Sequence, residues 1–124
     1  MKPVILKFGG TSMSDHNTWR QVLSIISKYD HPVVVVSATA CTTRMLLEAA
    51  DLGRQQKDEA MLDLTDEIRE KHVQIVKGFI GESGDTEIRM RCLNHIEEQI
   101  RTLELYLRQI MNEGRISLKN RDAV

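Results

Sequence analysis

The sequence has few of the residues that cross-link small proteins or bind structural metals. Its 124 residues include two cysteines, Cys41 and Cys92, which lie far apart. That spacing argues against a disulfide framework and against a zinc site. The histidines His16, His31 and His95 share no metal-ligand spacing with a cysteine or a carboxylate. We therefore expect no metal site and a reducing, cytoplasmic environment.

Long apolar runs and an excess of one charge are also missing. The apolar stretch in residues 1–8 is too short for a signal peptide, and no run approaches the roughly 20 apolar residues of a membrane helix. The 17 basic and 18 acidic side chains are mixed along the chain, so no basic stripe is available for nucleic acid phosphates. We expect neither a membrane nor a nucleic acid as a partner.

The chain does contain enough apolar residues, 41%, for one small folded unit. Two short runs predict strands: PVILKF at 3–8 and VVVV at 33–36. Both are typical of strands that are buried on both faces of a parallel sheet. A helix capped by Ser14 or Asp15 and stopped by Pro32 connects them, which predicts a right-handed parallel crossover.

Helices follow the second strand. One is expected from Thr42 or Thr43 to Gly53, and two long ones come after it. The first long helix carries its apolar stripe at Met61, Leu64, Ile68, His72, Ile75 and Phe79. The second carries a heptad seam at Leu93, Ile96, Ile100, Leu103, Leu107 and Ile110 and stops near Gly114. A glycine-containing link predicts an antiparallel hairpin, in which His72 is a packed histidine rather than a ligand.

The last residues, RISLKNRDAV, look like the beginning of another helix, and two strands leave both sheet edges open. We therefore expect an α/β fold that belongs to a longer enzyme. Strands supplied by a partner chain are the alternative.

The first candidate site is KFGGTS, which lies where the first strand ends. Ligands of open α/β sheets collect at the carboxyl ends of strands. Gly9 and Gly10 would let backbone N–H groups approach an anion, Lys7 would add a positive charge, and Thr11 and Ser12 would add hydroxyls. The order of residues is not that of a Walker loop. A plain glycine corner with a surface lysine remains the alternative.

The second candidate site is SATACTT, residues 37–43, at the end of the second strand. Two parallel neighbours would bring Ser37, Thr42 and Thr43 to the same edge as the glycines. Ala38 and Ala40 leave room there for a ligand, and hydroxyls at a helix start can bind a carboxylate. The alternative is that a threonine only caps its own helix.

These residues resemble a known family. VILKFGGTSM followed by VVVVSATACTTRMLLEAA looks like the amino-terminal part of aspartate kinase, in the amino acid kinase superfamily. The sharp motifs lie in the first third of the chain. The resemblance implies a partial three-layer αβα sandwich, with residues 1–124 as the amino-terminal part of the catalytic domain. The nucleotide-binding half, the regulatory ACT domains and a substrate-binding glutamate would then follow Val124.

The resemblance also implies an activity. ATP would give its γ-phosphoryl group to the side-chain carboxylate of L-aspartate, yielding 4-phospho-L-aspartate for lysine, threonine and methionine synthesis, with Mg²⁺ bridging the phosphates. Lys7 would be catalytic and phosphate-binding, and Ser37 and Thr43 would bind aspartate. The phosphate site would be completed by Gly9, Gly10, Thr11 and Ser12. The resemblance implies a homo-oligomer, and the chain alone is expected to be inactive.

The chain departs from the family pattern at one place. Where members commonly carry G-x-T-[ND], it reads CTTR. We expect Cys41 to be a small buried residue, with a reactive thiol as the alternative. We expect Arg44 to be a solvated helix residue rather than a partner of the substrate carboxylate. Two other functions stay open: a helical interaction module that pairs through the seam at 93–110, and a related kinase acting on acetylglutamate, glutamate or uridylate.

Overall fold

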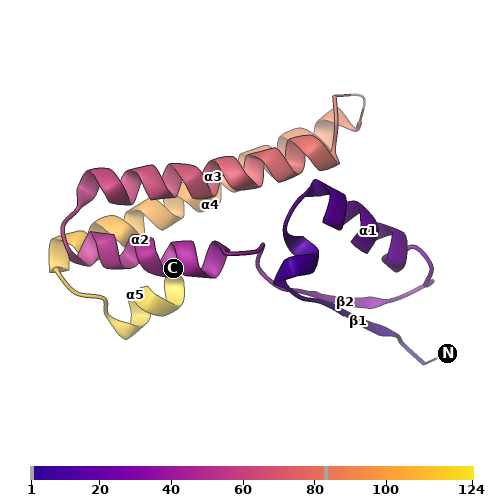
Figure 1. Cartoon of the computed structure of the whole chain (residues 1–124), viewed down its shortest axis with the longest axis horizontal. Coiled ribbons are helices and arrows are strands. Elements are labelled where there is room, and N and C mark those ends of the chain that lie inside the picture. The colour runs from indigo at the N-terminus through magenta and orange to yellow at the C-terminus, as the bar shows by residue number, and fades with distance from the viewer. Residues whose placement is uncertain (1, 83) are drawn as a thin grey trace.

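The computed structural model describes residues 2–82 and 84–124. It confirms a mixed α/β chain with two parallel strands and mostly helices, arranged as two units (Figure 1). The strand unit consists of β1 (Ile5–Phe8), the short helix η1 (Gly10–Met13), α1 (His16–Ile26) and β2 (Val33–Val36). The helical unit consists of α2 (Thr42–Arg54), α3 (Asp58–Phe79), α4 (Thr86–Glu113) and α5 (Leu118–Ala123).

The strand unit has the predicted β-α-β order. β1 and β2 pair in parallel, from Ile5 opposite Val33 to Phe8 opposite Val36. Asp15 caps α1 by accepting hydrogen bonds from the N–H groups of Asn17 and Thr18, both at 2.9 Å. The Thr18 hydroxyl bonds back to the Asp15 N–H, which completes a capping box and explains why the helix begins at this point.

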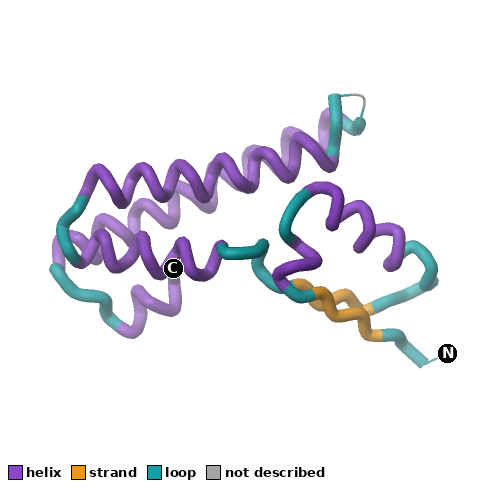
Figure 2. Tube along the Cα trace, in the orientation of Figure 1, coloured by secondary structure: helices purple, strands orange, loops and turns teal. Residues whose placement is uncertain are grey.

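The expected burial of the strands is wrong for this chain. All four valines of β2 are exposed, and β1 alternates between exposed and half-buried residues. A parallel strand is buried on both faces only when helices cover both faces of its sheet. Here α1 is the one long helix of the strand unit, and the helical unit lies to one side, as the ribbon and the tube both show (Figure 2).

The core lies in the helical unit. As predicted, α3 and α4 form an antiparallel hairpin, and α2 packs against both (Figure 2). The core that these three helices enclose consists of the buried residues Met45, Ala49, Ala50, Met61, Ile68, Ile100, Leu103, Leu107 and Ile110. Gly53 permits the close packing, because a Cβ there would lie 3.1 Å from Met61 Sδ. Gly114 ends α4 in the left-handed conformation, with φ of 65°.

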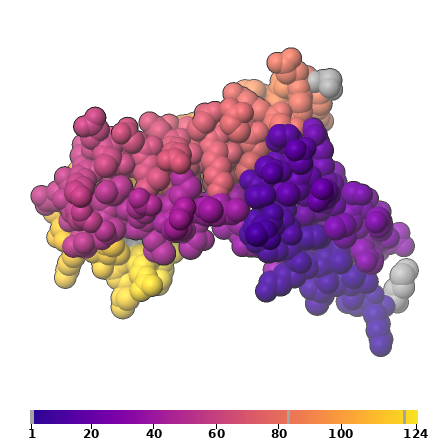
Figure 3. All heavy atoms as spheres, viewed as in Figure 1, coloured from indigo at the N-terminus to yellow at the C-terminus, as the bar shows by residue number. Residues whose placement is uncertain are grey.

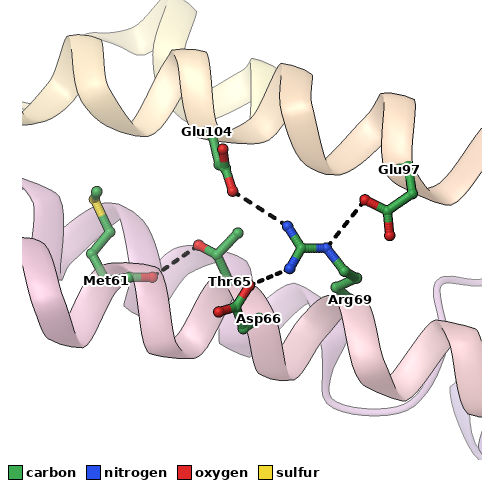
Figure 4. A network of polar contacts seen from close by, with 6 residues as sticks. All are labelled: Met61, Thr65, Asp66, Arg69, Glu97 and Glu104. Carbon is green, nitrogen blue, oxygen red and sulfur yellow. Dashed lines mark hydrogen bonds and ion pairs between the residues drawn. The ribbon is translucent and has the colours of Figure 1, made fainter.

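Charged residues also tie α3 to α4 (Figure 4). Arg69 of α3 forms ion pairs with Glu97, at 3.4 Å, and with Glu104, at 3.5 Å, and it also pairs with Asp66 on its own helix. Beside it, the fully buried Thr65 donates a hydrogen bond to the Met61 carbonyl at 2.8 Å. The buried part of the heptad seam is thus already paired inside this chain, which contradicts an interaction module built on that seam.

The two units meet along α1 and α3. Arg20 donates a hydrogen bond to the Gly78 carbonyl at 2.7 Å, and the rings of Trp19 and Phe79 lie edge to face, 6.2 Å apart. Gly78 is required there, because a Cβ would come within 2.5 Å of the His16 ring. In the space-filling view the strand unit is the indigo lobe at one end (Figure 3). None of the described helices combines the length and apolar character needed to cross a bilayer.

Candidate functional site

The two candidate segments meet at the carboxyl ends of β1 and β2. We call them the glycine turn, residues 7–12, and the hydroxyl loop, residues 37–43. The Ser37 N–H donates to the Phe8 carbonyl at 3.0 Å, which extends the β ladder into the loop. A Cβ on Gly10 would lie 3.7 Å from the Ala38 carbonyl oxygen and 3.9 Å from Ser37 Oγ. The predicted convergence of the two segments is therefore present for Gly10 with Ser37, Ala38 and Ala40.

The glycine turn does not use the left-handed freedom of its glycines. Gly9 has φ of −81° and ψ of 176°, and Gly114 is the one glycine with positive φ among those described. A Cβ on Gly9 would meet nothing within 4 Å, and one on Gly10 would make ordinary contacts. The described fold therefore tolerates a side chain at both positions, and backbone strain does not explain the two glycines.

The polar groups of the glycine turn suit the binding of an anion. Lys7 and Thr11 are exposed, Ser12 is half-buried, and the Lys7 ammonium pairs with no acceptor in residues 2–82 or 84–124. The Ser12 N–H is satisfied by the Gly9 carbonyl at 3.1 Å, whereas the N–H groups of Gly10 and Thr11 have no acceptor in the same described ranges. A free cation and two free amide donors suit an anion.

The hydroxyl loop separates its side chains into two groups. Thr42 is buried and its hydroxyl bonds to the hydroxyl of Thr39. Ser37 and Thr43 are exposed, and their hydroxyls bond to no other side chain or carbonyl that the structure describes. Neither threonine caps α2, because the capping position belongs to Cys41 and has no side-chain hydrogen bond. The two hydroxyls predicted to hold a substrate are thus available to one.

Cys41 is exposed, so the expectation that it is buried is wrong. Its backbone is left-handed, with φ of 66° and ψ of −7°, at the residue that precedes α2. Glycine adopts this conformation at no steric cost. Cys41 stands at the glycine position of the G-x-T-[ND] pattern and adopts the left-handed conformation that glycine favours. Arg44 is exposed on α2, as expected for a solvated helix residue.

Two residues of α3 reach the hydroxyl loop. Lys71 donates hydrogen bonds to the carbonyl of Ala40 and, at 3.3 Å, to the hydroxyl of Thr42. The ring of His72 bonds through Nε2 to the Thr39 hydroxyl at 3.1 Å and through Nδ1 to the Ile68 carbonyl at 2.7 Å. His72 is therefore packed within the protein, as predicted.

Lys71 was not singled out by the sequence patterns, although one signal was available. Ile68, Lys71, His72 and Ile75 follow one another at the spacing of a single helix face. A lysine and a histidine between two buried isoleucines need polar partners, and the hydroxyl loop supplies them. What the stripe could not reveal was which distant segment carries those partners.

The site holds no acidic cluster. The described residues contain no group of three or more histidine, cysteine or acidic side chains that could hold a metal ion. The residues of the glycine turn and the hydroxyl loop are lysine, phenylalanine, glycine, alanine, serine, threonine and cysteine, with no carboxylate among them. That set does not fit a resident magnesium site, whose ligands are carboxylate oxygens.

Comparison with known proteins places the chain in a family. Residues 2–113 match the model of the amino acid kinase family. The aspartokinase of Chlamydia trachomatis serovar D is 35% identical over 96 residues, which are 77% of this chain and 21% of that protein. The aspartokinase of Chlamydia muridarum is 40% identical over 77 residues, 60% of this chain and 16% of that protein. This chain thus spans about a fifth of the length of the curated relatives it matches, and it belongs to the amino acid kinase family.

Proposed function

We propose that residues 1–124 are the amino-terminal part of the catalytic domain of an aspartate kinase. The reaction would transfer the γ-phosphoryl group of ATP to the side-chain carboxylate of L-aspartate and yield 4-phospho-L-aspartate. The observation that carries the proposal is the meeting of the glycine turn and the hydroxyl loop, with Gly10 beside Ser37. The family match and the two relatives named aspartokinase support it.

Each segment has one task in this proposal. Lys7 neutralises charge on the transferred phosphoryl group, and the amides of Gly10 and Thr11 donate hydrogen bonds to its oxygens. Gly9 keeps the approach open, and Ser12 lies beside it in η1. Ser37 and Thr43 bind the aspartate. The attacking carboxylate is already ionised at neutral pH, so no general base is needed.

ATP binds mostly outside this chain in the proposal. Magnesium would come with the phosphates of the nucleotide and add neutralising charge there. We assign it no ligand among the described residues, since they do not include an acidic cluster.

The exposed β2 valines support a larger sheet in the longer protein. Val33 to Val36 are between 37% and 54% exposed. Exposing four consecutive apolar side chains to water costs free energy, which further elements packed against the sheet would recover. We propose that further strands and helices, the nucleotide-binding half and the regulatory ACT domains follow this chain, in a cytoplasmic homo-oligomer.

The decisive experiment uses the full-length protein that contains this chain. ADP release is measured with ATP and L-aspartate, and the acyl phosphate is trapped with hydroxylamine. Glutamate, acetylglutamate and uridylate serve as alternative acceptors. Turnover that requires aspartate supports the proposal, and turnover with another acceptor alone assigns the protein to a different branch of the family.

A second measurement separates a phosphate-binding turn from a plain glycine corner. Gly10→Ala adds one methyl group that the fold accommodates, so the melting temperature should change little. If the amides hold phosphate, the methyl group blocks the approach and kcat falls. Unchanged kcat would favour the glycine corner.

A further inference from the structure

We propose that Lys71 and His72 are positioning residues, which hold the hydroxyl loop in the form that presents Ser37 and Thr43. The consequence for catalysis rests on the proposed aspartate kinase function. The structural part of the proposal stands on the contacts between α3 and the loop.

Lys71 holds both sides of the strained residue in the loop. Its ammonium group donates to the carbonyl of Ala40, just before the left-handed Cys41, and to the hydroxyl of Thr42, just after it. A non-glycine residue persists in this conformation when its surroundings hold it there. The half-buried lysine supplies that hold from a helix that lies about 30 residues away in sequence.

His72 extends the same contact into a chain of hydrogen bonds. The Ile68 carbonyl can only accept, so Nδ1 carries a ring hydrogen. With the hydrogen on Nδ1 alone, Nε2 accepts from the Thr39 hydroxyl. Thr39 has then used its hydrogen and accepts from Thr42. The Thr42 oxygen in turn accepts from Lys71. Every hydroxyl in the chain is satisfied, and this satisfaction fixes the rotamers of both threonines.

The anchored residues lie between the two residues whose hydroxyls are left free. Thr39, Ala40 and Thr42 are held by α3. Ser37 and Thr43 on either side are exposed, and their hydroxyls have no partner among the described residues. Thr43 directly follows the buried Thr42, so its hydroxyl is placed by the anchor next to it. The helix itself is fixed, because Ile68 and Ile75 on the same face are buried. A loop held in this way binds its substrate without a cost of ordering.

The first test replaces Lys71 in the full-length protein. Lys71→Met keeps the length of the side chain and removes its donors, so the KM for aspartate should rise roughly tenfold, with a smaller change in kcat. Lys71→Arg retains donors and should recover part of the loss. Lys77→Met is the matched control, because Lys77 is an exposed lysine of α3 with no partner in the described part of the chain. An equal rise in KM for Lys71→Met and Lys77→Met would overturn the proposal.

The second test concerns His72. His72→Gln keeps an acceptor near Nε2 and should retain most of the affinity for aspartate, whereas His72→Leu removes it and should raise KM. Lys71→Met is also measured in a Thr43→Ala background. If Lys71 acts by placing Thr43, its effect on KM is smaller there. Full additivity of the two changes, or equal KM values for the Gln and Leu variants, would contradict a positioning role.

Amide hydrogen exchange gives a readout that does not need activity. In the full-length protein, exchange at residues 37–45 should become faster in Lys71→Met and His72→Leu and stay unchanged in Lys77→Met. If the wild type does not turn over aspartate but the loop exchanges faster in Lys71→Met, the proposed function is wrong and the positioning role of Lys71 is supported. If the wild type is active and exchange and KM are both unchanged in Lys71→Met, the positioning role is wrong although the proposed function is supported.

Discussion

The two units of the molecule differ in that one contains most of the core and the other contains most of the proposed site. Ten of the twelve buried apolar side chains that are described lie in the helical unit, and the strand unit contributes Met13 and Val22. The residues that suit an anion or a substrate lie in the strand unit and in the loop that leaves it. The comparison teaches that the part of this chain with the proposed site has fewer buried apolar side chains, and that α3 contacts it through Arg20 and through the hydroxyl loop.

The largest effect is expected in the core of the helical unit. Leu107 is fully buried, so Leu107→Ala should lower the free energy of unfolding by about 2–5 kcal/mol. Leu105 is 70% exposed on the same helix, and Leu105→Ala should change it by less than about 0.5 kcal/mol. Urea unfolding of each variant measures the difference. Equal losses would mean that the helical unit is not the stable part of the chain.

The next effect tests whether the strand unit carries the chemistry. Lys7 is exposed and unpartnered among the described residues, so Lys7→Ala should leave the melting temperature unchanged. In the full-length protein kcat should fall by roughly 100-fold, because in the proposed mechanism the Lys7 charge stabilises the transferred phosphoryl group. Lys28→Ala, at another exposed lysine of the strand unit, is the control. An unchanged kcat in Lys7→Ala would show that Lys7 is a surface lysine without a role in phosphoryl transfer.

A smaller effect is expected at the junction between the units. Cys41→Gly relieves the left-handed strain, partly offset by the flexibility of glycine, and should stabilise the protein by up to about 1 kcal/mol. Cys41→Ala keeps the strain and should change stability little. Thermal unfolding of both variants separates strain from loss of the thiol. Destabilisation by Cys41→Gly would show that the cysteine side chain stabilises the turn.

The smallest effect concerns the cap of α1. Hydrogen bonds from the N–H groups of Thr18 and Asn17 lower the pKa of Asp15 below its ordinary value of 3.8. A lowered pKa means that this stabilisation is present above pH 3.8 and is lost as the pH falls through the lower pKa of the folded state. Asp15→Asn keeps a capping oxygen without the charge, so the stability of this variant should depend less on pH below 3.8. Acid unfolding curves with identical slopes would contradict this role.

Local signals predicted most of the elements. Asp15 before a helical stripe and Gly114 behind a heptad seam each act on the backbone within a few residues, and the structure places those boundaries there. Pro32 did not mark the end of α1, which already ends at Ile26. The parallel pairing followed from two short β-branched runs with one helix between them. The prediction that those runs are buried was wrong, because the burial of a strand depends on which elements cover it and not on its composition.

The candidate site was predictable only in part for the same reason. Strand ends and glycines indicated where Gly10 and Ser37 would meet, because parallel topology brings consecutive strand ends to one edge. Helical spacing puts Thr42 on the same face of α2 as the buried Met45 and Ala49. Cys41 gave no sign of its left-handed backbone.

The short-range pattern of residues thus decided the helices, the strands, the caps and the edge of the sheet that carries the glycine turn, because each depends on neighbouring dihedral angles and apolar period. The packing of α3 against the hydroxyl loop decided which hydroxyls are free and which are held. That outcome needed Lys71 and His72, whose partners lie about 30 residues away and meet them only when the helices have packed.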